Sequence, residues 1–206
     1  MGNGNDSFVD SNRGENYDKK AMKKTIPIQK LALSALFAAL TVVGAYIRIP
    51  TPWSAFTLQV LFVYLSGTLL GPKYGALAQG VYVALGLFGL PVFTGGGGFD
   101  YVLRPTFGFL LSYPFMAAAV GAVCGGGTPS ARRVALACLA GMAVNYLIGL
   151  PYMGLIINLY LGQTMGLGEL LWSGMIMFLP FDFIKVLLTA LLARRLIPAL
   201  RRMQGA

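Results

Sequence analysis

Apolar residues fill most of the chain between positions 31 and 193, and short connections rich in Gly, Pro, Lys and Arg interrupt them. A helix that crosses the core of a bilayer needs about 20 apolar residues. Segments that approach or reach this length recur along the chain. We expect six membrane-spanning helices, at residues 31–47, 56–70, 74–88, 106–123, 134–155 and 171–193. The pattern predicts an all-α polytopic membrane protein, a compact bundle of six transmembrane helices.

The connections and the chain ends refine this prediction. Only Gly71, Pro72 and Lys73 separate the second and third segments. We therefore expect a tight helical hairpin in which Pro72 opens the second helix, because proline suits the first helical turn. Residues 1–27 are polar and basic and are predicted to form a disordered tail. Residues 28–197 then form the six-helix transmembrane domain, and residues 198–206 form a short basic tail.

Lysine and arginine predict how the bundle is oriented. Cytoplasmic connections of membrane proteins carry an excess of these residues. With six spans, both termini fall on one side together with Lys19, Lys20, Lys23, Lys24, Lys30, Lys73, Arg132, Arg133, Arg194, Arg195, Arg201 and Arg202. The opposite connections carry only Arg48 and Arg104. We expect a multi-pass protein of the cell membrane with both termini in the cytoplasm.

Composition excludes several classes of protein. The chain of 206 residues is 56% hydrophobic and 11% charged, whereas soluble domains are about one quarter charged. Its net charge of +9 suits lipid headgroups at helix flanks, so we expect the lipid bilayer and no nucleic acid as a partner. With no histidine and two cysteines, we expect no metal site, no cofactor and no catalytic residues. No phosphate-binding Gly-x-x-x-x-Gly-Lys-Ser/Thr loop occurs, so any ATP must be bound by another chain.

The strongest candidate for chemistry is the pair Asp182 and Lys185 in the sixth segment. A spacing of three residues places both on one helical face, which they share with Phe178 and Thr189. Ionisable groups within a span are costly and usually face a cavity or each other. The pair is either a mutually neutralising structural element or part of a ligand site. In a site, Lys185 would attract a carboxylate, and Asp182 would accept hydrogen bonds from ligand N–H groups or orient Lys185.

Three further polar residues are candidates. Asn145 lies in the middle of the fifth segment, where its amide can read a urea or amide group or can bond across helices as packing. Gln59, near the outer end of the second segment, has the same two interpretations. Arg104 either anchors an outer loop, meets an anion or is simply solvated.

The connection around residues 90–101 holds four consecutive glycines, Gly95, Gly96, Gly97 and Gly98, followed by Asp100. Glycines let the backbone approach a partner closely or move. A flexible link is one interpretation. Aromatic residues flank the glycines on both sides, however, whereas linkers are usually polar, so a lid over a pocket fits better.

Small residues on the first segment suggest a contact face. Ala35 and Ala39 are four residues apart, and this spacing lets two helices approach closely. The face either packs inside the bundle or docks a partner membrane protein.

Taken together, these stretches make the chain resemble a known family, the BioY proteins, which are biotin-binding S components of energy-coupling-factor (ECF) vitamin transporters. The stretches that carry the resemblance, in order, are Thr57-Leu58-Gln59, Leu70-Gly71-Pro72-Lys73-Tyr74-Gly75-Ala76, Gly86-Leu87-Phe88-Gly89-Leu90-Pro91-Val92-Phe93, the glycine run, Pro105-Thr106-Phe107-Gly108-Phe109, Asn145 and Asp182-Phe183-Ile184-Lys185. Together they span nearly the whole chain beyond the tail. The chain departs from the family's usual Gly-Pro-Thr-Gly-Gly-Tyr at residues 104–109, where Arg104 and Phe107 are expected to reshape the pocket.

The resemblance implies a function and partners. Biotin would be captured at the outer face under closing loops, with Asp182, Lys185 and Gly95 to Asp100 at the ligand. Ala35 and Ala39 would dock a transmembrane T protein, which works with two ATPase subunits, and the chain would be no enzyme. The alternatives are an S component for another vitamin, a membrane enzyme using Asp182 and Lys185 as acid and base, and a stand-alone secondary transporter. Short spans without an internal repeat argue against the last of these.

Overall fold

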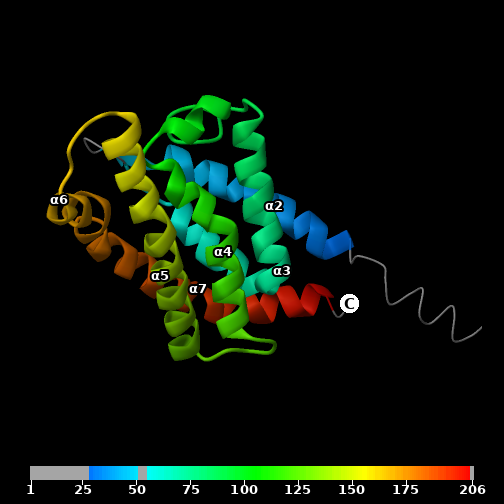
Figure 1. Cartoon of the computed structure of the whole chain (residues 1–206). Helices are drawn as coiled ribbons and strands as arrows, with labels where there is room; N and C mark the ends of the chain where they lie inside the picture. The colour runs from blue at the N-terminus through cyan, green and yellow to red at the C-terminus, as the bar shows by residue number, and fades with distance from the viewer. Residues whose placement is uncertain (1–27, 51–54, 205–206) are drawn as a thin grey trace, which may run out of the picture.

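Helices make up nearly all of the chain that this computed structural model describes, residues 28–50 and 55–204 (Figure 1). The elements are α2 (Ile28–Tyr46), β1 (Arg48–Pro50), β2 (Ala55–Thr57), α3 (Gln59–Leu87), η1 (Phe99–Leu103), α4 (Phe107–Cys124), α5 (Ala131–Leu155), η2 (Ile156–Tyr160), α6 (Leu167–Leu171), η3 (Trp172–Ile176) and α7 (Leu179–Gln204). The predicted tail at residues 1–27 lies outside the described residues.

Within the described residues, four helical stretches are long and apolar enough to cross a membrane: Ile28–Tyr46, Phe107–Cys124, Ala131–Tyr160 and Leu167–Leu200. Large aliphatic side chains such as Leu147 and Leu155 remain exposed on the outside of the bundle. Helices that are apolar on all sides are typical of proteins embedded in lipid. The chain is therefore an all-α membrane protein, as predicted.

The predicted hairpin at residues 71–73 is present inside α3. Gly71 interrupts the helix with φ 79° and ψ 179°, a conformation that favours glycine, and Pro72 follows at the start of the next helical turn. The two halves of α3 then run back along each other. The Gln79 amide nitrogen donates to the Ser66 hydroxyl over 3.1 Å, and a Cβ on Gly75 would lie 2.9 Å from Gly67 Cα.

Close approach between helices depends on small residues. A Cβ on Gly121 of α4 would lie 2.4 Å from the nitrogen of Pro72, and one on Gly141 of α5 would lie 2.5 Å from Val120. Such contacts allow dense packing where lipid offers no hydrophobic driving force between helices. Buried Gln79 also donates to Thr41 of α2 over 3.2 Å, which ties α2 to both halves of α3.

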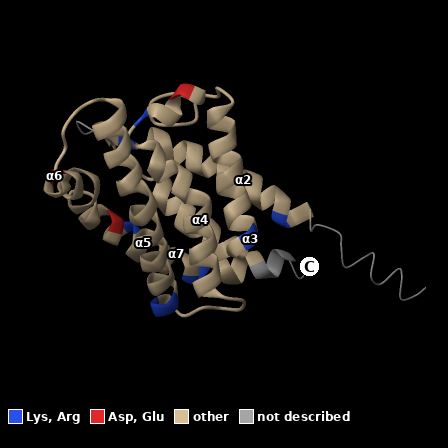
Figure 2. Cartoon of the chain, viewed as in Figure 1, with Lys and Arg blue, Asp and Glu red and all other residues tan. Residues whose placement is uncertain are grey.

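Most of the Lys and Arg residues lie toward one end of the bundle, and a few lie near the opposite end or in the middle (Figure 2). The ammonium groups of Lys30 and Lys73 lie 5.5 and 5.9 Å from the centre of the Tyr74 ring. Arg194 lines a hollow at this end together with residues 128–131. The uneven charge expected from the sequence is thus a property of the fold.

The structure adds a strand pair and moves one predicted boundary. In the connection after α2, β1 and β2 pair as a short antiparallel hairpin in which Arg48 opposes Thr57. The second segment was expected to begin at residue 56, whereas its helix begins at Gln59. At the other end of the chain, α7 continues to Gln204, into the segment 198–206 that the sequence describes as a short basic tail.

Candidate ligand cavity at one end of the bundle

A cavity of about 90 Å³ lies toward the other end of the bundle, beside the start of α3 and the connection between α3 and α4. A cavity that holds one water needs about 10–15 Å³, so this one has room for several. Its wall is formed by β2, α3, the connection between α3 and α4, α4, α5, η3 and the start of α7, through Ala55, Thr57, Gln59, Val60, Thr94, Tyr101, Thr106, Phe109, Leu110, Tyr113, Asn145, Tyr146, Met153, Ser173, Gly174, Phe178, Asp182 and Lys185. Apolar and aromatic walls with a few convergent polar groups are typical of small-molecule sites.

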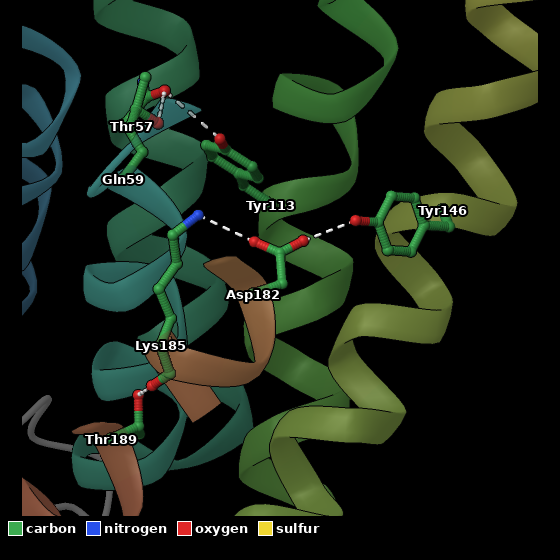
Figure 3. Close-up of polar contacts among 7 residues, drawn as sticks. All are labelled: Thr57, Gln59, Tyr113, Tyr146, Asp182, Lys185 and Thr189. Atoms are coloured by element: carbon green, nitrogen blue, oxygen red, sulfur yellow. Dashed lines mark hydrogen bonds and ion pairs between the residues drawn. The ribbon is translucent and has the colours of Figure 1, made fainter. Parts of the chain in front are cut away.

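Asp182 and Lys185 form a buried ion pair at this cavity (Figure 3). The Lys185 ammonium donates to Asp182 Oδ1 over 2.8 Å, and the Tyr146 hydroxyl donates to Oδ2 over 2.6 Å. Asp182 is 4% exposed and Lys185 6% exposed. Asp182 lies in the first turn of α7, where the helix dipole favours a negative charge. Because the ammonium has three donors, Lys185 keeps capacity for an acceptor in the cavity.

Asn145 of α5 presents a hydrogen-bond donor to the same cavity. The Ser112 hydroxyl lies 2.6 Å from Asn145 Oδ1 and 2.7 Å from the Phe109 carbonyl oxygen, so its single proton is shared between these two acceptors. The Asn145 amide nitrogen donates no hydrogen bond to any of the described residues. The arrangement suits the recognition of a ligand carbonyl oxygen.

Gln59, at the start of α3, connects three elements. Its Oε1 accepts from the Thr57 hydroxyl over 3.1 Å and from the Tyr113 hydroxyl over 3.5 Å. Its amide nitrogen donates to the hydroxyl of Tyr82. Gln59 is buried, and its position at the cavity wall is compatible with the predicted ligand contact.

The strand β2 closes one side of the cavity through an aromatic contact. The ring of Phe56 lies 4.7 Å from that of Phe178 and 4.3 Å from that of Phe181, measured between centroids. Tilted pairs at this distance are favourable. They hold β2, whose Ala55 and Thr57 line the cavity, against the start of α7.

The glycine loop, residues 88–106 between α3 and α4, forms another side of the cavity. Thr94 and Tyr101 line the cavity, and their hydroxyl oxygens are 3.3 Å apart. The backbone folds back on itself, since Phe93 and Gly96 exchange hydrogen bonds of 2.9 and 3.1 Å. A Cβ on Gly97 would lie 2.0 Å from a backbone oxygen, so the loop has a fixed, glycine-dependent shape.

Comparison with known proteins assigns the chain to a family. Residues 19–202 match the model of the BioY family. The chain belongs to the BioY family. It is 40% identical over 172 residues to a probable biotin transporter BioY of Lysinibacillus sphaericus, covering 83% of this chain and 88% of the relative. It is 37% identical over 170 residues to a biotin transporter BioY of Thermotoga maritima, covering 82% and 96%.

A solved structure agrees with this BioY membership. The fold matches a crystal structure described as the S-component for biotin from an ECF-type ABC transporter, with a TM-score of 0.70 and 28% identity, covering 82% of this chain and 90% of that chain. The predicted resemblance to BioY is therefore confirmed. The chain is a multi-pass membrane protein of a transporter family and not an enzyme.

Several of the candidate residues of this BioY-family chain do not reach the cavity wall. Asp182, Lys185, Asn145 and Gln59 line it, whereas Gly95, Gly96, Gly97, Gly98, Asp100 and Arg104 do not. The Arg104 guanidinium lies 4.6 Å from the centre of the Tyr101 ring. Arg104 therefore braces a wall residue from outside.

Three other residues that the sequence singled out have clear surroundings. Phe107 packs against the rings of Phe93 and Tyr152 beneath the glycine loop, away from the cavity wall. Ala35 and Ala39 are exposed on α2, as a docking face requires.

Sequence reasoning missed the aromatic hydroxyls of the site, those of Tyr101, Tyr113 and Tyr146. Tyrosine is unremarkable within an apolar span because its ring suits both core and lipid interface. Two of them could have been found from their neighbours in the sequence. Tyr146 directly follows Asn145, and Tyr101 lies just after the glycine run.

Proposed function

We propose that this chain is the biotin-capturing S component of an ECF-type vitamin importer. The observation that carries the proposal is the buried Asp182–Lys185 pair beside the free Asn145 donors, in a cavity of a BioY-family chain. The named functions of its relatives and of the solved S-component support it.

The chemistry of the cavity suits biotin. Biotin carries a cyclic urea at one end and a carboxylate at the end of an apolar chain. In our proposal the Lys185 ammonium attracts the carboxylate, and Asn145 donates to the urea carbonyl. Asp182 orients Lys185 through the 2.8 Å hydrogen bond. The aromatic wall, including Tyr113 and Phe178, packs against the apolar parts of the ligand.

The glycine loop and the β1–β2 hairpin serve as the covers of the site. Thr94 and Tyr101 meet the ligand from the loop, and Gln59 contacts it from α3. In this proposal the glycines 95–98, Asp100 and Arg104 contribute by giving the loop its shape and by bracing Tyr101.

The proposed topology has six membrane crossings. The two halves of α3 add two crossings to the four apolar helical stretches. Both termini then lie in the cytoplasm with the basic end of the bundle, in agreement with the distribution of Lys and Arg. The cavity opens toward the outside, and residues 28–197 form the transmembrane substrate-binding domain.

The proposed partners are a transmembrane T protein and two ATPase subunits. The exposed small residues Ala35 and Ala39 on α2 form the face that receives the T protein, because small side chains permit close helix approach. The chain carries no phosphate-binding loop of its own, so the ATPase subunits bind ATP.

Equilibrium binding of radiolabelled biotin to the purified full chain in lipid nanodiscs tests the function. We expect saturable binding of one biotin per chain, unaffected by an excess of other vitamins. Tight binding of a different vitamin with none of biotin would reassign the substrate. Uptake into liposomes by this chain alone, driven by an ion gradient, would replace the proposal by a secondary transporter.

A further inference from the structure

Three tyrosine hydroxyls tie the glycine loop to the helices. Tyr46 of α2, Tyr82 of α3 and Tyr152 of α5 each donate a hydrogen bond to a backbone carbonyl within residues 91–102. Among these three, Tyr82 alone also bonds a side chain of the cavity wall, that of Gln59. Tyr82 does not itself line the cavity.

The hydrogen-bond directions at Tyr82 follow from donor and acceptor chemistry. The Val92 carbonyl can only accept, so the single Tyr82 O–H points to the loop over 3.2 Å. The Tyr82 oxygen must then accept from Gln59, and only the amide nitrogen of Gln59 can donate. This orients the amide with its nitrogen toward Tyr82 and its oxygen toward Thr57 and Tyr113.

Burial holds this arrangement in place. Tyr82 is 0% exposed, and its ring packs edge-on to Phe93 of the glycine loop at 5.5 Å and stacks on Tyr113 at 6.3 Å. The oxygen of Gln59 is occupied by two hydroxyls. The second N–H of its amide has no partner among the described residues and is available to a ligand acceptor.

We propose that Tyr82 is a positioning residue for the ligand site, a proposal that rests on the proposed function of biotin capture. Through one hydroxyl, Tyr82 fixes the Gln59 amide so that an N–H serves the ligand, and it couples that orientation to the folded glycine loop. A ligand oxygen that engages Gln59 therefore stabilises the loop that covers it.

A double-mutant cycle on biotin affinity tests the coupling to the cavity. Tyr82→Phe should weaken binding roughly three- to tenfold, the range expected for one buried hydrogen bond. In the Gln59→Leu background the same change should add less than about twofold, because the group on which it acts is gone. Effects that multiply in the double variant would overturn the proposal.

The matched control is Tyr152→Phe, which removes a loop anchor without a bond to Gln59. Its effect on affinity should multiply with that of Gln59→Leu. If Tyr152→Phe is as non-additive with Gln59→Leu as Tyr82→Phe is, then Gln59 responds to any loss of loop order and not to Tyr82 in particular. The proposal would then be wrong.

A ligand-free measurement separates this proposal from the proposed function. Hydrogen–deuterium exchange of the backbone amides at residues 92–98 should be about three- to tenfold faster in Tyr82→Phe, and also faster in Gln59→Leu. Unchanged exchange in both variants would refute the coupling. If the wild-type chain binds no biotin, the proposed function fails, while the exchange rates still decide whether Tyr82 couples Gln59 to the loop.

Discussion

Removal of the Lys185 charge separates a ligand site from a structural ion pair. In Lys185→Met the apolar stem is kept and the ammonium is lost. The Asp182 carboxylate, 4% exposed, would then keep only its hydrogen bond from Tyr146. Breaking a buried pair in this way costs about 3–5 kcal/mol because an uncompensated charge remains. We expect a clear loss of thermal stability.

The double variant Asp182→Asn/Lys185→Met removes both charges and keeps the side-chain volumes. Replacing a buried ion pair by neutral residues is often close to neutral for stability, so most of the lost stability should return. Biotin affinity should not return with it. A hydrogen bond to a charged group contributes about 1.5–3 kcal/mol, which corresponds to a loss of roughly 10- to 150-fold.

Both quantities are measured on the purified variants in nanodiscs, by thermal unfolding and by titration with labelled biotin. The matched control is Thr189→Val, since this buried hydroxyl bonds the Lys185 backbone carbonyl and does not line the cavity. Its affinity should stay within about twofold of the wild type. Wild-type affinity in the stable double variant would mean that the pair is structural, and would refute the assignment of Lys185 to the ligand.

Four further outcomes follow from the structure. Asn145→Leu removes the free amide donor and should lower biotin affinity roughly fivefold or more; unchanged affinity would make the amide a packing group. Phe56→Ala removes two aromatic contacts, each worth about 0.5–1.5 kcal/mol. It should speed biotin release roughly tenfold in a chase experiment. An unaltered release rate would show that β2 does not cover the site. Gly97→Ala places a Cβ 2.0 Å from a backbone oxygen and should lower biotin affinity. The control Gly126→Ala, whose Cβ meets nothing within 4 Å, should leave the affinity unchanged. Equal affinities of the two variants would argue against a loop of fixed shape. Ala39→Trp should abolish copurification with the T protein and leave biotin binding intact, and retained assembly would exclude that face.

The sequence predicted the parts of the fold that depend on length and local spacing. Apolar segments whose helical length is close to the thickness of a bilayer predicted the helices, and Gly71-Pro72 predicted the hairpin. The three-residue spacing gave the shared face of Asp182 and Lys185. Each of these depends on neighbours close along the chain, which is why one sequence sufficed.

The parts that the sequence did not predict depend on contacts between distant segments. The strands β1 and β2 are three residues each, too short for an alternating pattern. The partners of Gln59 come from β2, from the second half of α3 and from α4. The glycine run predicted a loop of unusual backbone, but only the fold shows that Thr94 and Tyr101, rather than the glycines, reach the cavity.

The identity of the small molecule that the purified chain carries tests the central claim most directly. Native mass spectrometry of the full chain, purified from cells grown with biotin, gives the mass of the complex, and denaturation of the same sample releases the ligand for identification. The account predicts one bound molecule with the mass of biotin, absent from the Asp182→Asn/Lys185→Met variant. A different bound vitamin, or equal biotin on the variant, would contradict it.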